Sequence, residues 1–278
     1  MTRMTVNLFK GLLATAASTL FFVSVGATPA SAVNFGLNFG IDQSCGGSGL
    51  CSEAGGTLTG IDNINFNYAG IVTQAADGTF TETGFMAWTG FLDDSGNPVT
   101  PSFLNADYKV YGLFTGHGTA APGGPGEILA SFSDFTITFY MDDNLNSTPH
   151  ADATVTGTTA DDNAIASASL LNNGLADLKP FQALAKGNYE IILSDFGRTL
   201  FGESFFNSPD PFYTFVDFGG QTLQVSGIPN PITFPFVADL AGSGNMFFIP
   251  EPTTLGLIGF GLLSMGTFLY RRRQTVSV

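Results

Sequence analysis

The sequence predicts an all-β fold, either an antiparallel β-sandwich or a barrel-like domain, with an N-terminal signal helix and a C-terminal transmembrane helix. Three observations support this prediction. Gly and Phe account for 35 and 28 of the 278 residues, whereas charged residues make up 12%. Short stretches that alternate apolar and polar residues recur along residues 33–249, as half-buried strands do. Clusters of Gly, Pro and Asn separate these stretches, which is typical of antiparallel domains.

The composition also excludes several classes of protein. The chain has 23 acidic and 9 cationic residues, so its formal charge is −14. A protein that follows a nucleic-acid backbone needs many cations, so no nucleic-acid partner is expected. Coiled coils need more Ala, Glu, Lys, Leu and Arg. A hydrophobic content of 44% is too high for a disordered acidic chain.

Residues 1–32 have the layout of a secretory signal peptide. Two cations stand near the start, an uncharged run from residue 11 to 26 follows, and Ala30 and Ala32 then form a small-x-small site. This order predicts cleavage by signal peptidase after Ala32. An uncleaved N-terminal anchor is the alternative.

The C-terminus has a second export-related pattern. Residues 255–270 carry no charge, and as a helix they would span about 24 Å, somewhat less than the roughly 30 Å of a hydrocarbon core. Cations next to a membrane span stay on the cytoplasmic side, so the preceding domain is expected outside the inner membrane. The uncharged run is flanked by Pro250, Glu251 and Pro252 on one side and by Arg271, Arg272 and Arg273 on the other.

These C-terminal residues resemble the PEP-CTERM sorting signal of Gram-negative bacteria, and the resemblance covers residues 250–278. It implies processing by an exosortase, a membrane transpeptidase usually found with exopolysaccharide genes. The expected location is a transient inner-membrane anchor, followed by the cell surface or the extracellular matrix. An ordinary C-terminal membrane anchor is the alternative.

Residues 33–249 are expected to form one exported β-rich domain, with two tightly packed β-subdomains as the alternative. Residues 33–252 keep all 23 acidic residues but only 4 of the 9 cations, so their formal charge is −19. The clearest alternating stretch has Phe135, Ile137, Phe139 and Met141 on one face. Further strands are expected at 63–68, 79–92, 107–115, 153–159, 164–171, 189–193, 212–218, 221–227 and 232–238.

Two local features of the sequence are expected to interrupt the series of strands. Apolar spacing over 175–185 allows a short helix, although Pro180 would interrupt its interior. Gly219 and Gly220 predict a turn between two strands. No repeat of fixed period occurs, which argues against a solenoid or a propeller.

Cys45 and Cys51 are the only cysteines, and a Gly-rich segment separates them. In an exported chain this spacing predicts a local structural disulfide. A redox motif would have two intervening residues, and a zinc site would need more ligands.

A calcium site is one interpretation of the acidic loop that begins at residue 142. Asp142, Asn144 and Asn146 offer oxygen ligands at alternate positions. An EF-hand is excluded because Ser147 and Ala153 stand where Gly and Glu are required. Asp and Asn also shape ordinary turns, so both interpretations stay open, and no other cofactor is expected.

The sequence predicts no catalytic residues. His117 and His150 lie in polar, loop-like sequence, and no Gly-x-Ser-x-Gly elbow precedes a helix pattern. No glutamate stands in a recognisable catalytic context, although the folded spacing of a carboxylate pair cannot be seen in a sequence. The protein is therefore not expected to be an enzyme.

The order of the segments at 107–116, 135–142, 209–213 and 242–245 resembles the flocculation-associated PEP-CTERM proteins of floc-forming bacteria. The resemblance implies a non-enzymatic surface or matrix protein that promotes cell aggregation, in flocs or biofilms, together with exopolysaccharide. A carbohydrate-binding module is one alternative and would need exposed aromatic side chains. A secreted glycoside hydrolase is another and would need a cleft with two close carboxylates. Tyr68, Trp88, Tyr111 and Tyr213 could stack on sugars if they are exposed, and ordinary core residues are the alternative.

Overall fold

The computed structural model describes residues 38–45, 55–182 and 186–249. Within them one antiparallel sheet of nine strands dominates, in the order β10-β11-β13-β14-β3-β4-β5-β6-β9. The prediction of an all-β domain is confirmed. The strands of this sheet are β3 (Asn63–Gln74), β4 (Thr79–Leu92), β5 (Lys109–Pro122), β6 (Ile128–Asp142), β9 (Asn163–Leu170), β10 (Gly174–Leu178), β11 (Gly187–Arg198), β13 (Phe215–Ser226) and β14 (Phe236–Ile249).

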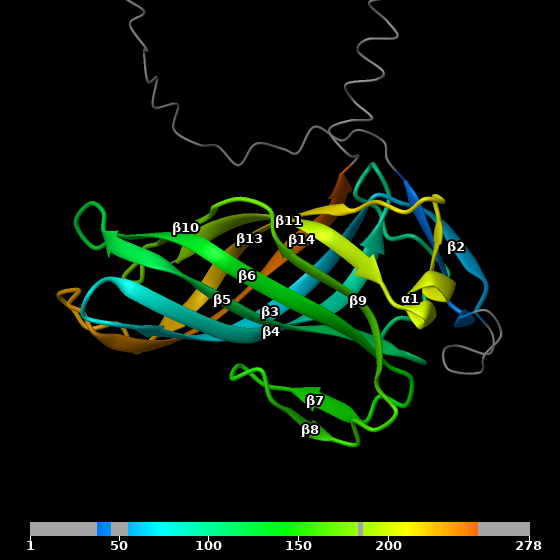
Figure 1. The fold of residues 1–278 in the computed structure, drawn as a ribbon, viewed down its shortest axis with the longest axis horizontal. Helices are drawn as coiled ribbons and strands as arrows, with labels where there is room; N and C mark the ends of the chain where they lie inside the picture. Colours follow the sequence, from blue (N-terminus) through cyan, green and yellow to red (C-terminus); the bar gives the residue numbers. More distant parts are fainter. Residues whose placement is uncertain (1–37, 46–54, 183–185, 250–278) are drawn as a thin grey trace, which may run out of the picture. The chain divides into compact units, whose positions relative to one another are not determined.

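The sheet closes into a barrel because β9 and β10 share one position between β6 and β11 (Figure 1). Along β6, Phe132 pairs with Gly174 of β10, and Thr136 pairs with Ser169 of β9. Both short strands also pair with β11 on their other side. The nine strands therefore occupy eight positions around the ring. An eight-position barrel is just wide enough to be filled by side chains or to hold one small ligand.

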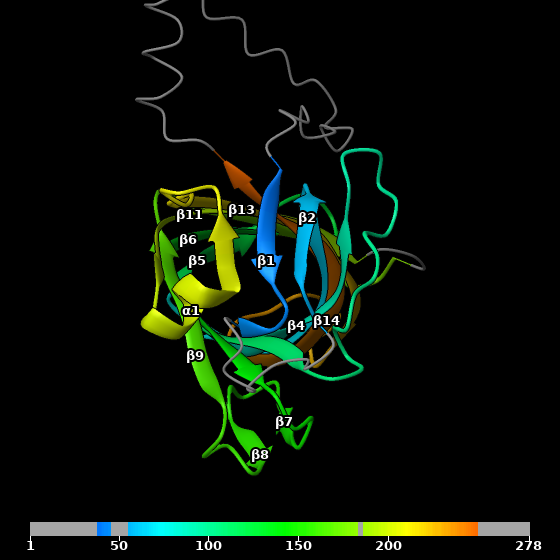
Figure 2. The same cartoon turned by 90° about the vertical axis from the view of Figure 1, so that its right-hand side faces the viewer.

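One end of the barrel is covered by a second, three-stranded sheet and a short helix. These elements are β1 (Phe39–Asp42), β2 (Thr57–Ile61), β12 (Phe206–Ser208) and α1 (Leu200–Phe205). In Figure 2 they lie in front of the barrel opening. Thr199 caps α1, since its hydroxyl accepts a hydrogen bond from the Gly202 N–H at 3.0 Å. A separate hairpin of β7 (Ser147–Pro149) and β8 (Val155–Gly157) projects from the barrel (Figure 1).

None of the helices in these ranges is long and apolar enough to cross a membrane. The predicted signal helix and transmembrane helix fall outside the described residues.

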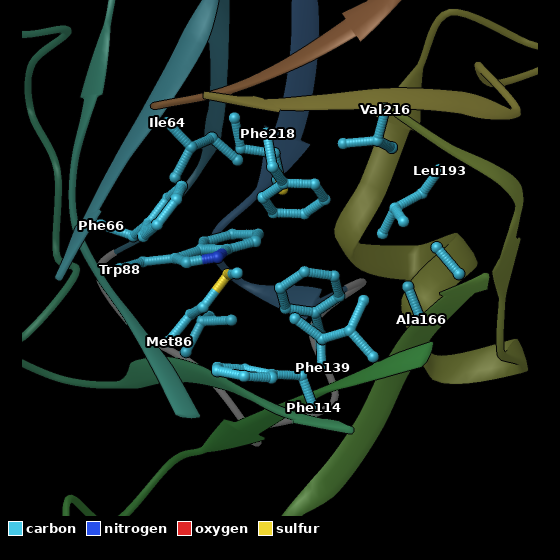
Figure 3. Close-up of a cluster of buried hydrophobic side chains, with 14 of the residues drawn as sticks. Ile64, Phe66, Met86, Trp88, Phe114, Phe139, Ala166, Leu193, Val216 and Phe218 are labelled. Atoms are coloured by element: carbon cyan, nitrogen blue, oxygen red, sulfur yellow. The ribbon is translucent and has the colours of Figure 1, made fainter. Parts of the chain in front are cut away.

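Inward-facing aromatic side chains fill the half of the barrel next to β1 and α1. Trp88, Phe139 and Phe218 converge at its centre (Figure 3). The ring centroids of Trp88 and Phe139 are 5.7 Å apart, and those of Phe139 and Phe218 are 6.2 Å apart. The predicted apolar face of β6 is confirmed, because its four members at 135, 137, 139 and 141 are each no more than 2% exposed.

The short helix that the apolar spacing over 175–185 allows does not form in the described residues 175–182. Residues 174–178 form strand β10 instead, and Leu175 pairs with Ser131 on β6 and with Glu190 on β11. Backbone hydrogen bonds to two neighbouring strands outweigh the weak helical spacing. Within the described residues the helix is α1, which lies further along the chain and has six residues.

The turn expected at Gly219 and Gly220 is also wrong, because both residues lie inside β13. The two strands predicted at 212–218 and 221–227 are therefore largely one strand. A Cβ added at Gly220 would overlap the Tyr189 hydroxyl and approach the Ser243 carbonyl oxygen at 2.6 Å. Glycine at this position lets the Tyr189 ring lie close to the backbone of β13. In a sequence, a glycine needed for such a close approach looks the same as a glycine needed for a turn.

Candidate functional site

The half of the barrel away from β1 and α1 contains a cavity of about 60 Å³. Its lining includes residues at the ends of strands that lead into hairpin turns, among them Gln74 and Phe80. Met86 and Phe114 line the cavity and also belong to the apolar cluster drawn in Figure 3. Most of the lining is aliphatic or aromatic, and a pocket of this kind with a few polar groups is the usual form of a small-molecule site.

Glu82 is the one carboxylate among the described residues that line this cavity. It lies on β4, in the inward row that also contains Phe80 and Met86, and is 8% exposed. Burial raises the pKa of Glu82 from 4.5 to about 7, because an apolar environment disfavours the charged form. No hydrogen bond or ion pair to Glu82 is found among the described residues. A buried carboxyl without a partner is costly for stability and is typical of functional sites.

Two tyrosines complete the polar part of the cavity. The hydroxyls of Tyr68 on β3 and Thr222 on β13 share a hydrogen bond of 2.5 Å. The ring of Tyr189 on β11 meets the Tyr68 ring edge-on at 5.1 Å. The Tyr189 hydroxyl is buried and has no hydrogen-bond partner in the described part of the chain. Burial, together with the nearby Glu82 carboxylate, raises the pKa of both tyrosines.

Glu82 is not among the functional residues predicted from the sequence. A signal was present, because Glu82 is the charged member of the row that alternates inward along residues 80–88. A single charge on an otherwise apolar strand face indicates either a buried partner or a site. The aromatic side chains considered for sugar stacking are not well exposed. Tyr68, Trp88 and Tyr111 are at most 7% exposed, and Tyr213 is half-buried.

The predicted calcium ligands lie at the base of the β7–β8 hairpin. Asp142 accepts hydrogen bonds from the backbone N–H groups of Asn144 at 3.1 Å and Ser147 at 2.8 Å, as in an ordinary Asp turn. The side-chain amides of Asn144 and Asn146 donate to Asp161 Oδ2 at 2.7 and 3.1 Å. The described residues contain no group of three or more His, Cys, Asp or Glu that could hold a metal ion. Calcium binding stays a prediction.

The Asp142 carboxylate is fully buried and pairs with the Lys109 ammonium at 3.0 Å. Burial raises its pKa, but the N–H donors and Lys109 outweigh burial and lower the pKa overall. Lys109 also donates to the Ser147 carbonyl. The charge pair therefore joins β5 to the first residue of the hairpin.

Replacing Lys109 with methionine should lower the free energy of unfolding by about 1–2 kcal/mol at pH 7. The change leaves a buried carboxylate without its counter-ion, and the partial exposure of Lys109 moderates the loss. The same change in an Asp142→Asn background should cost much less, as a double-mutant cycle in urea would show. Lys186→Met is the matched control, and an equal loss in both backgrounds would contradict the ion pair's role.

Cys45 is 2% exposed and forms a disulfide bond. Its Sγ lies 3.7 Å from Met141 Sδ on β6, so the turn that follows β1 packs against β6. Cys51, the only other cysteine in the chain, lies outside the described residues.

The predicted export signals also lie outside the described residues: Ala30 and Ala32, Pro250, Glu251 and Pro252, and Arg271, Arg272 and Arg273. Comparison with known protein families bears on the C-terminal signal and not on Ala30 or Ala32. The PEP-CTERM protein-sorting motif matches residues 248–273. No curated protein and no solved structure matches the chain. The chain thus carries a PEP-CTERM sorting signal and is an extracellular protein that is exported and sorted by an exosortase.

Proposed function

We propose that the exported barrel is a non-enzymatic surface or matrix protein that promotes cell aggregation together with exopolysaccharide. The observation that carries this proposal is the sorting motif at residues 248–273, because it directs an acidic β-domain out of the cell. The resemblance of the central region to flocculation-associated proteins supports the same function. Signal peptidase would act first, at the small-residue site before residue 33.

The charge of the domain supports a role among polyanions. Three of the four cations in residues 33–252 make intramolecular contacts. Lys109 pairs with Asp142, Lys179 pairs with two carboxylates at 2.9 and 3.1 Å, and Arg198 donates to a backbone carbonyl at 2.6 Å. The outward charge is therefore mainly negative. Such surfaces repel each other and anionic polysaccharide at low ionic strength, and divalent cations would reduce this repulsion and allow association.

The alternative functions have less support. A carbohydrate-binding surface would use exposed aromatic side chains, but three of the four named candidates are buried. A glycoside hydrolase needs two carboxylates within about 5–10 Å of each other, whereas the described residues contribute one carboxylate, Glu82, to the cavity lining.

Deleting the gene should reduce cell aggregation and leave polysaccharide secretion intact. Complementation with the full chain should restore aggregation, because the exosortase can then sort the barrel. A chain without residues 250–278 should fail to restore it. Settling assays and assays of secreted polysaccharide would measure these outcomes, and immunoblots would confirm equal amounts of each chain.

A chain with Pro250, Glu251 and Pro252 replaced by alanine provides the matched control, since it keeps the apolar run and the arginines. If this chain restored aggregation fully, the C-terminus would act as an ordinary anchor. Normal aggregation in the deletion strain would refute the proposed function itself.

A further inference from the structure

We propose that the cavity in the barrel is a binding site for a small, mainly apolar molecule that carries a primary amine, with its ammonium group facing Glu82. The proposal goes beyond the role in aggregation, and it depends on the size, the wall and the polar groups of the cavity.

The cavity is the right size for a small organic molecule. By the same measure of volume, one water needs roughly 10–15 Å³, so about 60 Å³ holds several waters or one compact ligand. The wall consists largely of apolar side chains, including Val72, Phe132, Ile191 and Leu240. Such a wall favours an apolar ligand over water, because burial of apolar surface is favourable and water finds few partners there.

Two polar groups of the cavity have no hydrogen-bond partner among the described residues, and a ligand could supply one. Glu82 is buried without a hydrogen-bond donor among the described residues, and the Tyr189 hydroxyl is also unpartnered. Tyr68 and Thr222 bond to each other, which fixes the side of the cavity where the hydroxyls lie. A buried polar group without a partner costs more stability than an apolar side chain of the same shape in its place. The presence of an unpaired carboxyl here therefore indicates that a ligand group supplies its partner.

An amine fits this environment better than an acid or a hydrocarbon. A carboxylate ligand would face the charge of Glu82 and enter a domain of formal charge −19. A hydrocarbon would leave Glu82 unpaired. A cation is attracted by the acidic domain, and its N–H groups make charge-assisted hydrogen bonds with a carboxylate.

Binding should be coupled to the ionisation of Glu82. Among the described residues, the other titratable groups in the cavity lining are Tyr68 on β3 and Tyr189 on β11, whereas β5, β6, β10, β13 and β14 contribute none. Both tyrosines stay protonated near neutral pH, because their pKa values are raised. When the ammonium enters, the Glu82 carboxyl releases its proton to solvent and pairs with the ligand as a carboxylate. Affinity should therefore rise as the pH increases through about 7.

Isothermal titration calorimetry with three ligands of equal shape tests the proposal, using the protein as cells export it. Benzylamine should bind at pH 8, and benzyl alcohol and benzoate should bind at least tenfold more weakly. Benzylamine should bind at least fivefold more tightly at pH 8 than at pH 6. Glu82→Gln should weaken benzylamine binding at least tenfold and remove this pH dependence. Glu203→Gln, which changes an exposed glutamate on α1, should leave both unchanged.

A second variant tests the location independently of Glu82. Ala238 lines the cavity and is 1% exposed, so Ala238→Leu should fill the space and abolish binding. The proposal is overturned if benzylamine fails to bind at millimolar concentration, which would indicate a cavity that holds water only. It is also overturned if Glu82→Gln or Ala238→Leu binds benzylamine as the unmodified protein does, since the amine would then bind the acidic surface.

Discussion

Replacing Phe206 with alanine is expected to lower the free energy of unfolding by about 3–5 kcal/mol, because the change opens a large cavity in the aromatic core. Phe206 belongs to β12 and is 0% exposed. Phe206 lies in the three-stranded covering sheet, and its side chain packs against residues of the barrel strands. Its ring lies 5.0 to 6.1 Å, between centroids, from the rings of Trp88, Phe196, Phe205, Phe212 and Phe248.

Urea denaturation of the exported protein would measure this loss. Trp88 is the only tryptophan of the chain, and it lies beside Phe206, so its fluorescence reports on the region that changes. Phe181→Ala is the matched control, because Phe181 is 47% exposed, and its loss should stay within about 0.5 kcal/mol. Similar losses for the two variants would mean that the covering sheet does not pack on the barrel as described.

Glu82→Gln is expected to stabilise the protein at pH 8 by up to about 3 kcal/mol. Glu82 has a pKa of about 7 in the folded chain against an ordinary value of 4.5, and each unit corresponds to about 1.4 kcal/mol. The folded pKa is raised, so ionisation costs folding free energy. This cost is absent below about pH 4.5, grows between 4.5 and 7, and is complete above about 7. Glutamine keeps the size of the side chain and removes the charge.

The measurement is the difference in unfolding free energy between the two proteins at pH 4 and pH 8. The difference should be small at pH 4 and favour the variant at pH 8. Glu203→Gln, at an exposed position, should show no such trend. A difference that does not change with pH would show that Glu82 is solvated. The same variant should lose benzylamine binding, so the expected gain in stability accompanies a loss of function.

Much of the barrel could be predicted from local patterns. The alternation at 135–141 and at 189–193 indicated strands with one buried face, and residues 137, 139, 191 and 193 are among the buried core. Strand β4 has the predicted limits, 79–92. Such patterns are visible because the side chains of a strand alternate between its two faces.

Other parts of the fold could not be predicted, because they depend on distant strands. Leu175 lies in a strand only because β6 and β11 leave a gap that β10 fills. Gly220 lies inside a strand because it pairs with Tyr189 on β11 and with Gly244 on β14. β1 and β12 are short, and their pairing of Gly40 with Ser208 joins segments that are 168 positions apart in the chain.

The sequence by itself determined that the chain is an exported, acidic, mainly β protein with a sorting signal, since each of these properties is written in a continuous segment or in the composition. The tertiary structure alone decided that the sheet closes and leaves a cavity. Tyr68 and Thr222 are 154 positions apart in the chain, yet their hydroxyls meet inside the barrel, and Glu82 lines the same space. The physical reason is that alternation places a side chain on one face of a strand, whereas closure of the barrel decides what that face encloses.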